Sequence, residues 1–186
     1  QDQKPIVKIY NDFTSPITCN EFHPIDSIFI SGCEDGRLYI HSHLVSNTKH
    51  ALHTFYDGYA VRSLSIHPSG DYLAVASEHP IPKIYDLETL QGYFVPYPGA
   101  DVGDVYVSPS VHTTNHGHHI GPINMLRYNN NGLLYATASD DGSIKFWDGI
   151  TNRVIRTVRD AHGTSPVYSV HFTPSSQSLL SFGGDC

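Results

Sequence analysis

Residues 142–148 read Gly-Ser-Ile-Lys-Phe-Trp-Asp, and the surroundings of this segment recur along the chain. Asp141 stands six residues before Trp147, between Asp140 and a glycine. The corresponding position in related segments is filled by Asp35, His79 and Asp185. Positions 35, 79, 141 and 185 are separated by 44, 62 and 44 residues. A spacing that is kept over most of the chain predicts a repeated structural unit.

A second landmark has the same spacing. The bulky residue that ends an apolar run before a turn recurs at Phe22, Ile66, Tyr128 and Phe172, which gives intervals of 44, 62 and 44 residues again. The long interval exceeds the others by 18 residues and indicates one insertion. A period in the low forties that ends in Trp-Asp is typical of WD-repeat blades, each a four-stranded sheet of a β-propeller. The chain resembles this family, so we expect an all-β propeller fragment of about three full blades with parts of flanking blades.

Each unit reads as four short strands, a to d, bounded by turns rich in Pro, Gly, Asp and Asn. The predicted strands are 17–22, 27–33, 37–41 and 51–56, then 61–66, 72–77, 82–85 and 92–97, then 123–128, 133–139, 143–147 and 153–158, and finally 167–172 and 178–182. The predicted units cover 12–59, 60–97, 118–161 and the truncated 162–186, with 98–117 as an inserted loop. That loop is rich in Gly, Pro, Ser, Thr and His, and it is either functional or a tolerated excursion.

Propellers need roughly 4–8 blades to close, so the sequence predicts a piece of a longer propeller. In that arrangement residues 5–10 end an earlier blade. We also expect sheet edges and apolar blade faces that neighbouring blades normally cover.

The composition argues against several classes of protein. The net charge is −7 with 13 histidines counted as neutral, so a broad nucleic-acid surface is not expected, since such surfaces depend on Lys and Arg. The three cysteines, Cys19, Cys33 and Cys186, lack Cys-x-x-Cys spacing. The sequence holds no Asn-x-Ser/Thr motif, signal-like stretch or apolar run near 18 residues. These features predict an intracellular, reducing location without a membrane partner.

The sharpest set of side chains is His119, Ser139 (or Thr137), Asp141 and Trp147. In WD-repeat proteins the corresponding residues form a buried structural tetrad, which ties the loop before strand a to strand c. The resemblance implies that the carboxylate accepts from the imidazole, the imidazole meets a hydroxyl, and the hydroxyl meets the indole N–H. A Ser-His-Asp hydrolase is the rival interpretation, but a tryptophan adds nothing to nucleophile activation. We expect no catalytic residue.

The tetrad is degraded in other units. The tryptophan position holds His41 in the first unit and Tyr85 in the second. In the fourth, Gly183 stands at the serine position, and Ser181 with His162 could compensate. Degenerate blades are common in propellers, so these departures predict lower local rigidity within the same fold.

His112, His116, His118 and His119 form the one plausible metal cluster in the sequence. Imidazoles at such spacing can bind Zn²⁺, yet no cysteine or carboxylate cooperates nearby except the distant Asp104. A solvated polar loop is the competing interpretation, and the tetrad already uses His119. The sequence also lacks a phosphate-binding loop. We therefore predict no metal, no cofactor and no small-molecule substrate.

In a propeller the d–a loops and b–c turns converge on one rim. The resemblance to WD-repeat proteins implies partner contacts just after the first aliphatic residue of strand a and just before the turn aspartate. These positions hold Thr18, Glu34, Arg62, Glu78, Asn124, Asp140 and Tyr168. Arg and Tyr are common interface anchors, and the acids beside them favour a basic peptide or protein segment. The alternative is that these are ordinary solvated loop residues.

Two stretches carry a closer resemblance. They are residues 61–72 with 77–80 and 83–89, and residues 143–153 continuing through 160–162. Both are similar to the WD-repeat subunits of cleavage stimulation factor, the complex that promotes pre-mRNA 3′-end cleavage before polyadenylation. His79-Pro80 in place of the usual aspartate turn and the run Trp-Asp-Gly-x-x-Asn-Arg are more specific than Trp-Asp alone. The chain departs from that family at His41 and in the His-rich insertion.

This resemblance implies a noncatalytic scaffold in the nucleus. Its partners would be protein subunits of the mRNA 3′-end cleavage machinery, with RNA contacted indirectly through the complex. Three alternatives stay open: a WD-repeat scaffold of another pathway, such as a ubiquitin-ligase adaptor; a metal-binding propeller that uses the His-rich loop; and direct RNA binding, which would depend steeply on salt.

Overall fold

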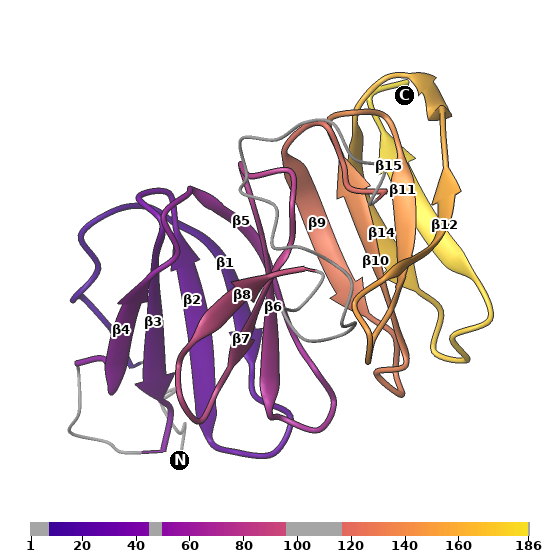
Figure 1. Cartoon of the computed structure of the whole chain (residues 1–186). Coiled ribbons are helices and arrows are strands. Elements are labelled where there is room, and N and C mark those ends of the chain that lie inside the picture. Colours follow the sequence, from indigo (N-terminus) through magenta and orange to yellow (C-terminus); the bar gives the residue numbers. More distant parts are fainter. Residues whose placement is uncertain (1–7, 45–49, 96–116, 186) are drawn as a thin grey trace, which may run out of the picture.

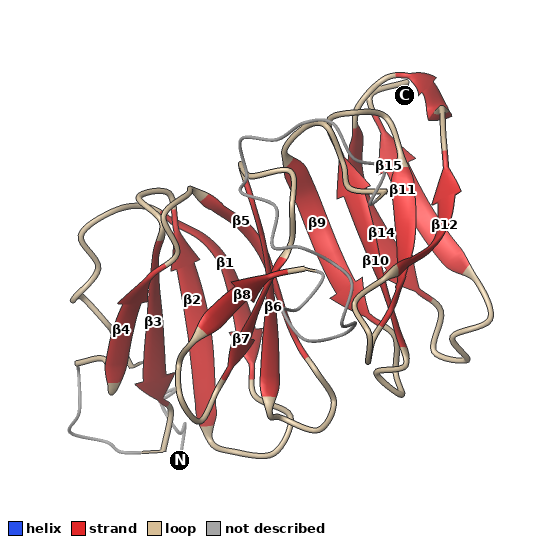
Figure 2. Ribbon diagram, in the orientation of Figure 1, coloured by secondary structure: helices blue, strands red, loops and turns tan. Residues whose placement is uncertain are grey.

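The computed structural model describes residues 8–44, 50–95 and 117–185. These residues form strands joined by turns, and no helix occurs among them (Figure 2). Accordingly, no helix in the described ranges could cross a membrane. The predicted early strand at 5–10 lies partly, and the insertion at 98–117 almost wholly, outside the described residues, as do His112, His116 and Asp104. The unit limits derived from the sequence stay a prediction.

The strands form three four-stranded antiparallel sheets and one two-stranded sheet, which confirms the predicted partial β-propeller. Blade 1 contains β1 (Ile17–Phe22), β2 (Ile28–Cys33), β3 (Arg37–Ser42) and β4 (His53–Tyr56). Blade 2 contains β5 (Val61–Ile66), β6 (Tyr72–Ser77), β7 (Lys83–Asp86) and β8 (Gly92–Phe94). Blade 3 contains β9 (Ile123–Tyr128), β10 (Leu134–Ser139), β11 (Ile144–Asp148) and β12 (Val154–Val158). Blade 4 contains β14 (Val167–Phe172) and β15 (Leu179–Gly183), preceded by the short β13 (Ala161–Thr164).

Strands that follow one another in sequence are hydrogen-bonded neighbours within each sheet. The first strands of successive blades contact one another in the order β1, β5, β9 and β14, so the sheets follow one another from the N-terminus to the C-terminus (Figure 1). The first strands of the four units, which both spacings predicted to be equivalent, therefore occupy equivalent positions in the four blades. Most strand ends coincide with the sequence prediction, most of the others differ by one or two residues, and β13 was not predicted.

The apolar core lies between the sheets. Ile30, Leu38, Leu64 and Tyr85 belong to a cluster that joins blades 1 and 2. A second cluster joins blades 2 and 3 around Trp147, and a third joins blades 3 and 4. Because blades 2 and 3 each supply side chains to two clusters, their stability depends on both neighbours, as expected for repeats that stack side by side.

Polar contacts also connect the turns between the first two strands of successive blades. His23 Nε2 lies 2.8 Å from the carbonyl oxygen of Gly70, and His67 Nε2 lies 3.2 Å from that of Gly132. Gly132 has φ +72°, and a Cβ atom there would collide with the His67 ring. The histidine that directly follows Phe22 in blade 1 and Ile66 in blade 2 thus places an imidazole against the next blade, which the spacing alone did not predict.

Candidate functional site

The tetrad of blade 3 is a continuous chain of hydrogen bonds that runs from Asp141 to Trp147. His119, from the loop before β9, has its Nδ1 2.8 Å from Asp141 Oδ2 and its Nε2 2.6 Å from Thr137 Oγ1. Trp147 Nε1 donates to the same hydroxyl over 2.9 Å. Thr137 is therefore the linking residue: of the two hydroxyls that the sequence offered, the alternative Thr137 takes this place and the first choice, Ser139, does not. Ser139 ends β10, and its hydroxyl donates to the carbonyl oxygens of residues 121 and 122 instead.

The protonation states follow from this geometry. Burial lowers the pKa of His119, which is therefore neutral. Its Nδ1–H donates to Asp141, so Nε2 accepts from the Thr137 hydroxyl. Burial alone would raise the pKa of Asp141, but hydrogen bonds from His119 and Ser143 outweigh it and hold that pKa well below its usual range.

The arrangement is structural in its geometry. Thr137 is fully buried, its proton is directed at His119, and its oxygen receives the indole N–H. A hydroxyl held on both sides in this way has no free approach for a substrate carbonyl. Its effect is to give the buried indole N–H of Trp147 a hydrogen-bond partner and to pair both ring nitrogens of His119.

Blade 4 repeats part of this chain. His162 Nδ1 lies 2.8 Å from Asp185 Oδ1, and its Nε2 lies 2.9 Å from Ser181 Oγ. The hydroxyl thus comes from the position equivalent to Thr137, two residues before Gly183.

Blades 1 and 2 use other polar pairs at the tryptophan position. In blade 2, the Tyr85 hydroxyl donates to Asp57 Oδ1 over 2.6 Å, and burial raises the pKa of Tyr85 well above its usual range. In blade 1, the fully buried His41 lies 2.8 Å from Asp12 Oδ1. The carboxylates come from loops before the first strands, so each degenerate blade keeps a buried loop-to-strand contact.

Four of the seven predicted rim positions coincide with β-bulges. In each first strand the pairing register skips one residue, and the skipped residues are Thr18, Arg62, Asn124 and Tyr168. A bulge leaves one residue unpaired and re-aims its side chain. The bulges explain why the same position of every blade projects at the end of the sheet beside the turn between the second and third strands.

Four of the predicted rim residues form one network across blades 2 and 3. The Arg62 guanidinium lies 2.6 Å from Asn124 Oδ1, 3.2 Å from Asp140 Oδ2 and 3.7 Å from Glu78 Oε1. Asn124 Nδ2 donates to Asp140 Oδ1 over 2.7 Å and to the Val167 carbonyl over 2.9 Å. The Arg62 side chain is 29% exposed, whereas those of Asp140 and Glu78 are 36% and 57% exposed. Arg62 therefore organises the rim, and the acids face solvent.

The other three predicted rim residues behave differently. Thr18 donates to the carbonyl oxygens of Gly32 and Val61, so its hydroxyl is used within the fold between blades 1 and 2. Glu34 is exposed at the turn of blade 1. Tyr168 is 54% exposed at the start of β14 in blade 4, directly after Val167, whose carbonyl oxygen accepts from Asn124. Tyr168 and the acids are the rim groups most open to a partner.

No group of three or more His, Cys, Asp and Glu side chains in the described ranges could hold a metal ion. His118, a member of the predicted histidine cluster, stacks on Trp147 with ring centres 6.1 Å apart and planes inclined by 21°. His119 serves the tetrad. The two remaining histidines lie outside the described residues.

Comparisons with known proteins agree with this architecture. The family model described as WD domain, G-beta repeat, matches residues 4–42, 49–86, 109–148 and 153–186. Cleavage stimulation factor subunit 50 of Arabidopsis thaliana is 36% identical over 97% of this chain and 38% of its own length. Pre-mRNA-processing factor 19 of Oryza sativa subsp. japonica is 26% identical over 91% of this chain and 37% of its own length. COMPASS component SWD1 of Saccharomyces cerevisiae is 26% identical over 68% of this chain and 26% of its own length. The chain thus spans less than two fifths of the length of each of these relatives.

Proposed function

Because the chain belongs to the WD40 repeat family, we propose that it is part of a noncatalytic interaction scaffold of the nuclear machinery that cleaves and polyadenylates pre-mRNA. The observation that carries the pathway is the 36% identity to cleavage stimulation factor subunit 50 along 97% of the chain. An alignment of this length includes both the blades and the loops between them. RNA would then be contacted through the other subunits, since the chain has a net charge of −7.

The mechanism we propose is presentation of a rigid rim to a basic segment of a partner subunit. Rigidity comes from the Arg62 network, which joins blades 2 and 3 by hydrogen bonds, while the bulges of the first strands direct the side chains toward the rim. Glu34, Glu78 and Asp140 supply negative charge, and Tyr168 supplies an exposed aromatic surface. Complementary charge guides association and selects partners, while an aromatic anchor supplies affinity.

The test uses the intact protein and purified subunits of the cleavage machinery, with affinity measured by calorimetry. Tyr168→Ala and Arg62→Ala are expected to weaken binding about tenfold each. Phe22→Ala is the matched control, because Phe22 is a 68% exposed aromatic residue at the end of β1 that is farther from the rim. Thermal melting of each variant shows that the fold is kept.

Unchanged affinity in both rim variants would show that the partner binds elsewhere. Recovery of ubiquitin-ligase components in place of cleavage subunits, when the intact protein is used as bait, would show that the pathway is wrong. Because the two results come from separate measurements, the rim assignment and the pathway can fail independently.

A further inference from the structure

A groove with a volume of about 680 Å³ lies between blades 2 and 3. Its walls come from the turn between β5 and β6, the turn between β7 and β8, and the turn between β11 and β12. In antiparallel sheets of this order, these turns lie at the opposite ends of the strands from the rim. The groove is therefore a separate surface, and the Arg62 network takes no part in it.

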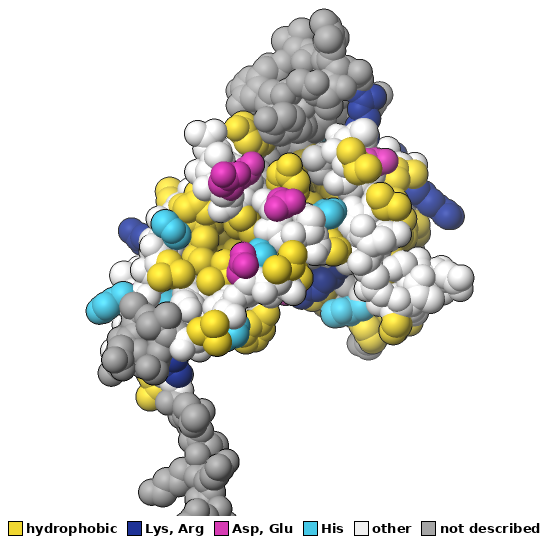
Figure 3. Space-filling view, turned by 90° about the horizontal axis from the view of Figure 1, so that it is seen from below, with side chains coloured by type: hydrophobic (Ala, Val, Ile, Leu, Met, Phe, Trp, Pro, Cys, Tyr) yellow, Lys and Arg dark blue, Asp and Glu magenta, His cyan; other side chains and the backbone are white. Residues whose placement is uncertain are grey.

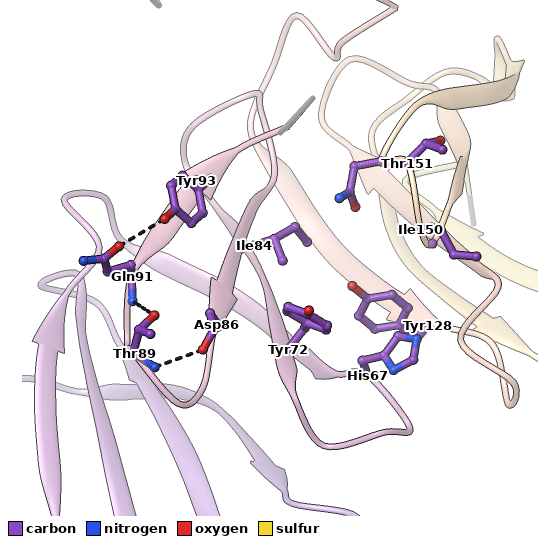
Figure 4. Close-up of a pocket in the computed structure, with 12 residues that line it drawn as sticks. His67, Tyr72, Ile84, Asp86, Thr89, Gln91, Tyr93, Tyr128, Ile150 and Thr151 are labelled. Carbon is purple, nitrogen blue, oxygen red and sulfur yellow. Dashed lines mark hydrogen bonds between the residues drawn. The ribbon is translucent and has the colours of Figure 1, made fainter. Parts of the chain in front are cut away.

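Aromatic and aliphatic side chains form the floor of the groove. His67 contacts both Tyr72 and Tyr128 edge to face, with ring centres 6.4 and 5.1 Å apart (Figure 4). Ile84 lies above them in the close-up, and Ile150 faces them from blade 3. Tyr72 is 45% exposed, so a ligand can reach its ring.

Asp86 gives the groove a negative charge. Its Oδ1 accepts the backbone N–H groups of Glu88 and Thr89 over 2.8 and 2.9 Å, which fixes the carboxylate at the wall. His67 adds no positive charge, because its Nδ1 accepts the Ser69 N–H over 3.0 Å while its Nε2 bonds the Gly132 carbonyl. Asp86 is thus the one charged side chain among the described residues that line the groove.

The surface around the groove is also apolar and acidic. On the side of the molecule that carries these turns, hydrophobic side chains gather in the middle together with Asp, Glu and His side chains, whereas Lys and Arg lie mainly around the outline (Figure 3). A cation is favoured there, and a phosphate is not.

We propose that this groove binds an arginine side chain from an extended segment of a partner protein. A guanidinium is planar, stacks on aromatic rings and pairs with a carboxylate through two parallel hydrogen bonds, so the tyrosines and Asp86 match its two binding modes. The volume lies within the usual range of ligand pockets, roughly 300–1,000 Å³, and leaves room for residues that flank the arginine. This surface gives the scaffold a second point of attachment, on the edge opposite the rim.

The probe is a fluorescent nonapeptide of glycine and alanine with a central arginine, and binding to the intact protein is followed by anisotropy. The same peptide with citrulline keeps the shape and removes the charge. We expect the arginine peptide to bind about fivefold more tightly than the citrulline peptide, and the difference to shrink in high salt.

Two variants locate the binding site. Asp86→Asn keeps an oxygen that can accept the two backbone N–H groups but removes the charge, and Tyr72→Leu keeps apolar bulk but removes the ring. Each should weaken the arginine peptide about fivefold. Asp148→Asn is the matched control: Asp148 accepts two backbone N–H groups in the equivalent turn of blade 3, over 2.9 and 2.7 Å, but does not line the groove.

The proposal is overturned if the arginine peptide does not bind, if citrulline binds equally well, or if Asp148→Asn weakens binding as much as Asp86→Asn. Tighter binding of an all-proline peptide or of an oligouridylate, lost in Tyr72→Leu, would assign the groove to a different ligand and also overturn it. Melting curves of all variants exclude loss of folding as the cause.

Discussion

The Thr137 hydroxyl is the part of blade 3 whose removal is easiest to interpret. Thr137→Val replaces one oxygen by a methyl group of similar size, so it opens no cavity. Two buried polar atoms lose their partner: the indole Nε1 of Trp147, now 2.9 Å from the hydroxyl, and Nε2 of His119, now 2.6 Å from it. A buried polar group left without a partner costs about 1–3 kcal/mol. We expect Thr137→Val to lower the free energy of unfolding by about 3 kcal/mol.

Thr137→Ser is the matched control, because it keeps the hydroxyl and loses a buried methyl group. That loss costs about 1 kcal/mol. Urea unfolding followed by the fluorescence of Trp147, the one tryptophan of this sequence, reports on the blade that contains the change. If Thr137→Val proves no more destabilising than Thr137→Ser, the hydrogen-bond chain does not stabilise the blade and the reasoning is refuted.

Three further predictions concern pH, turn geometry and the rim. The free energy of unfolding should fall as the pH drops below about 6.5, because burial lowers the pKa of His119 in the folded state and the unfolded chain therefore protonates this histidine first. A second fall should begin near pH 4, because the pKa of Asp141 is lowered in the folded state and the unfolded chain protonates this carboxylate first. Urea titrations at several pH values check both steps, and a flat profile would contradict them. Gly132→Ala should lower the free energy of unfolding by at least about 3 kcal/mol, because the new methyl group meets the His67 ring of blade 2. Gly163→Ala, with φ +61° and no neighbour within 4 Å, should lower it by about 1 kcal/mol through backbone strain alone. Equal losses in urea unfolding would disprove the contact with His67. Arg62→Ala should change the unfolding free energy by less than about 1 kcal/mol, because the guanidinium is partly exposed, even though partner binding weakens about tenfold; a large loss of stability by calorimetric melting would make Arg62 a structural residue.

The repeat architecture was predictable from the sequence, because strand length, turn residues and spacing are local properties. The choice between Ser139 and Thr137 was not. The two residues lie two apart on β10 and point to the same face, so alternation alone cannot separate them. The carbonyl oxygens that capture the Ser139 hydroxyl belong to a loop about 18 residues earlier, and only the folded chain brings them close.

Other features depend on contacts between blades. β13 was not predicted, because Ala161-His162-Gly163-Thr164 has no alternation of apolar and polar residues. The rim positions were placed by family resemblance, but their bulges and the pairing of Arg62 with Asn124 and Asp140 required the structure. The groove near Tyr72 joins residues from two blades, so no single stretch of sequence carries its signal.

A cryo-electron microscopy map of the intact protein bound to its partner subunit tests the scaffold account most directly. The account predicts a partner segment lying over the rim, with basic side chains beside Glu78 and Asp140 and a contact to Tyr168. Partner density that leaves these three residues open to solvent would contradict it.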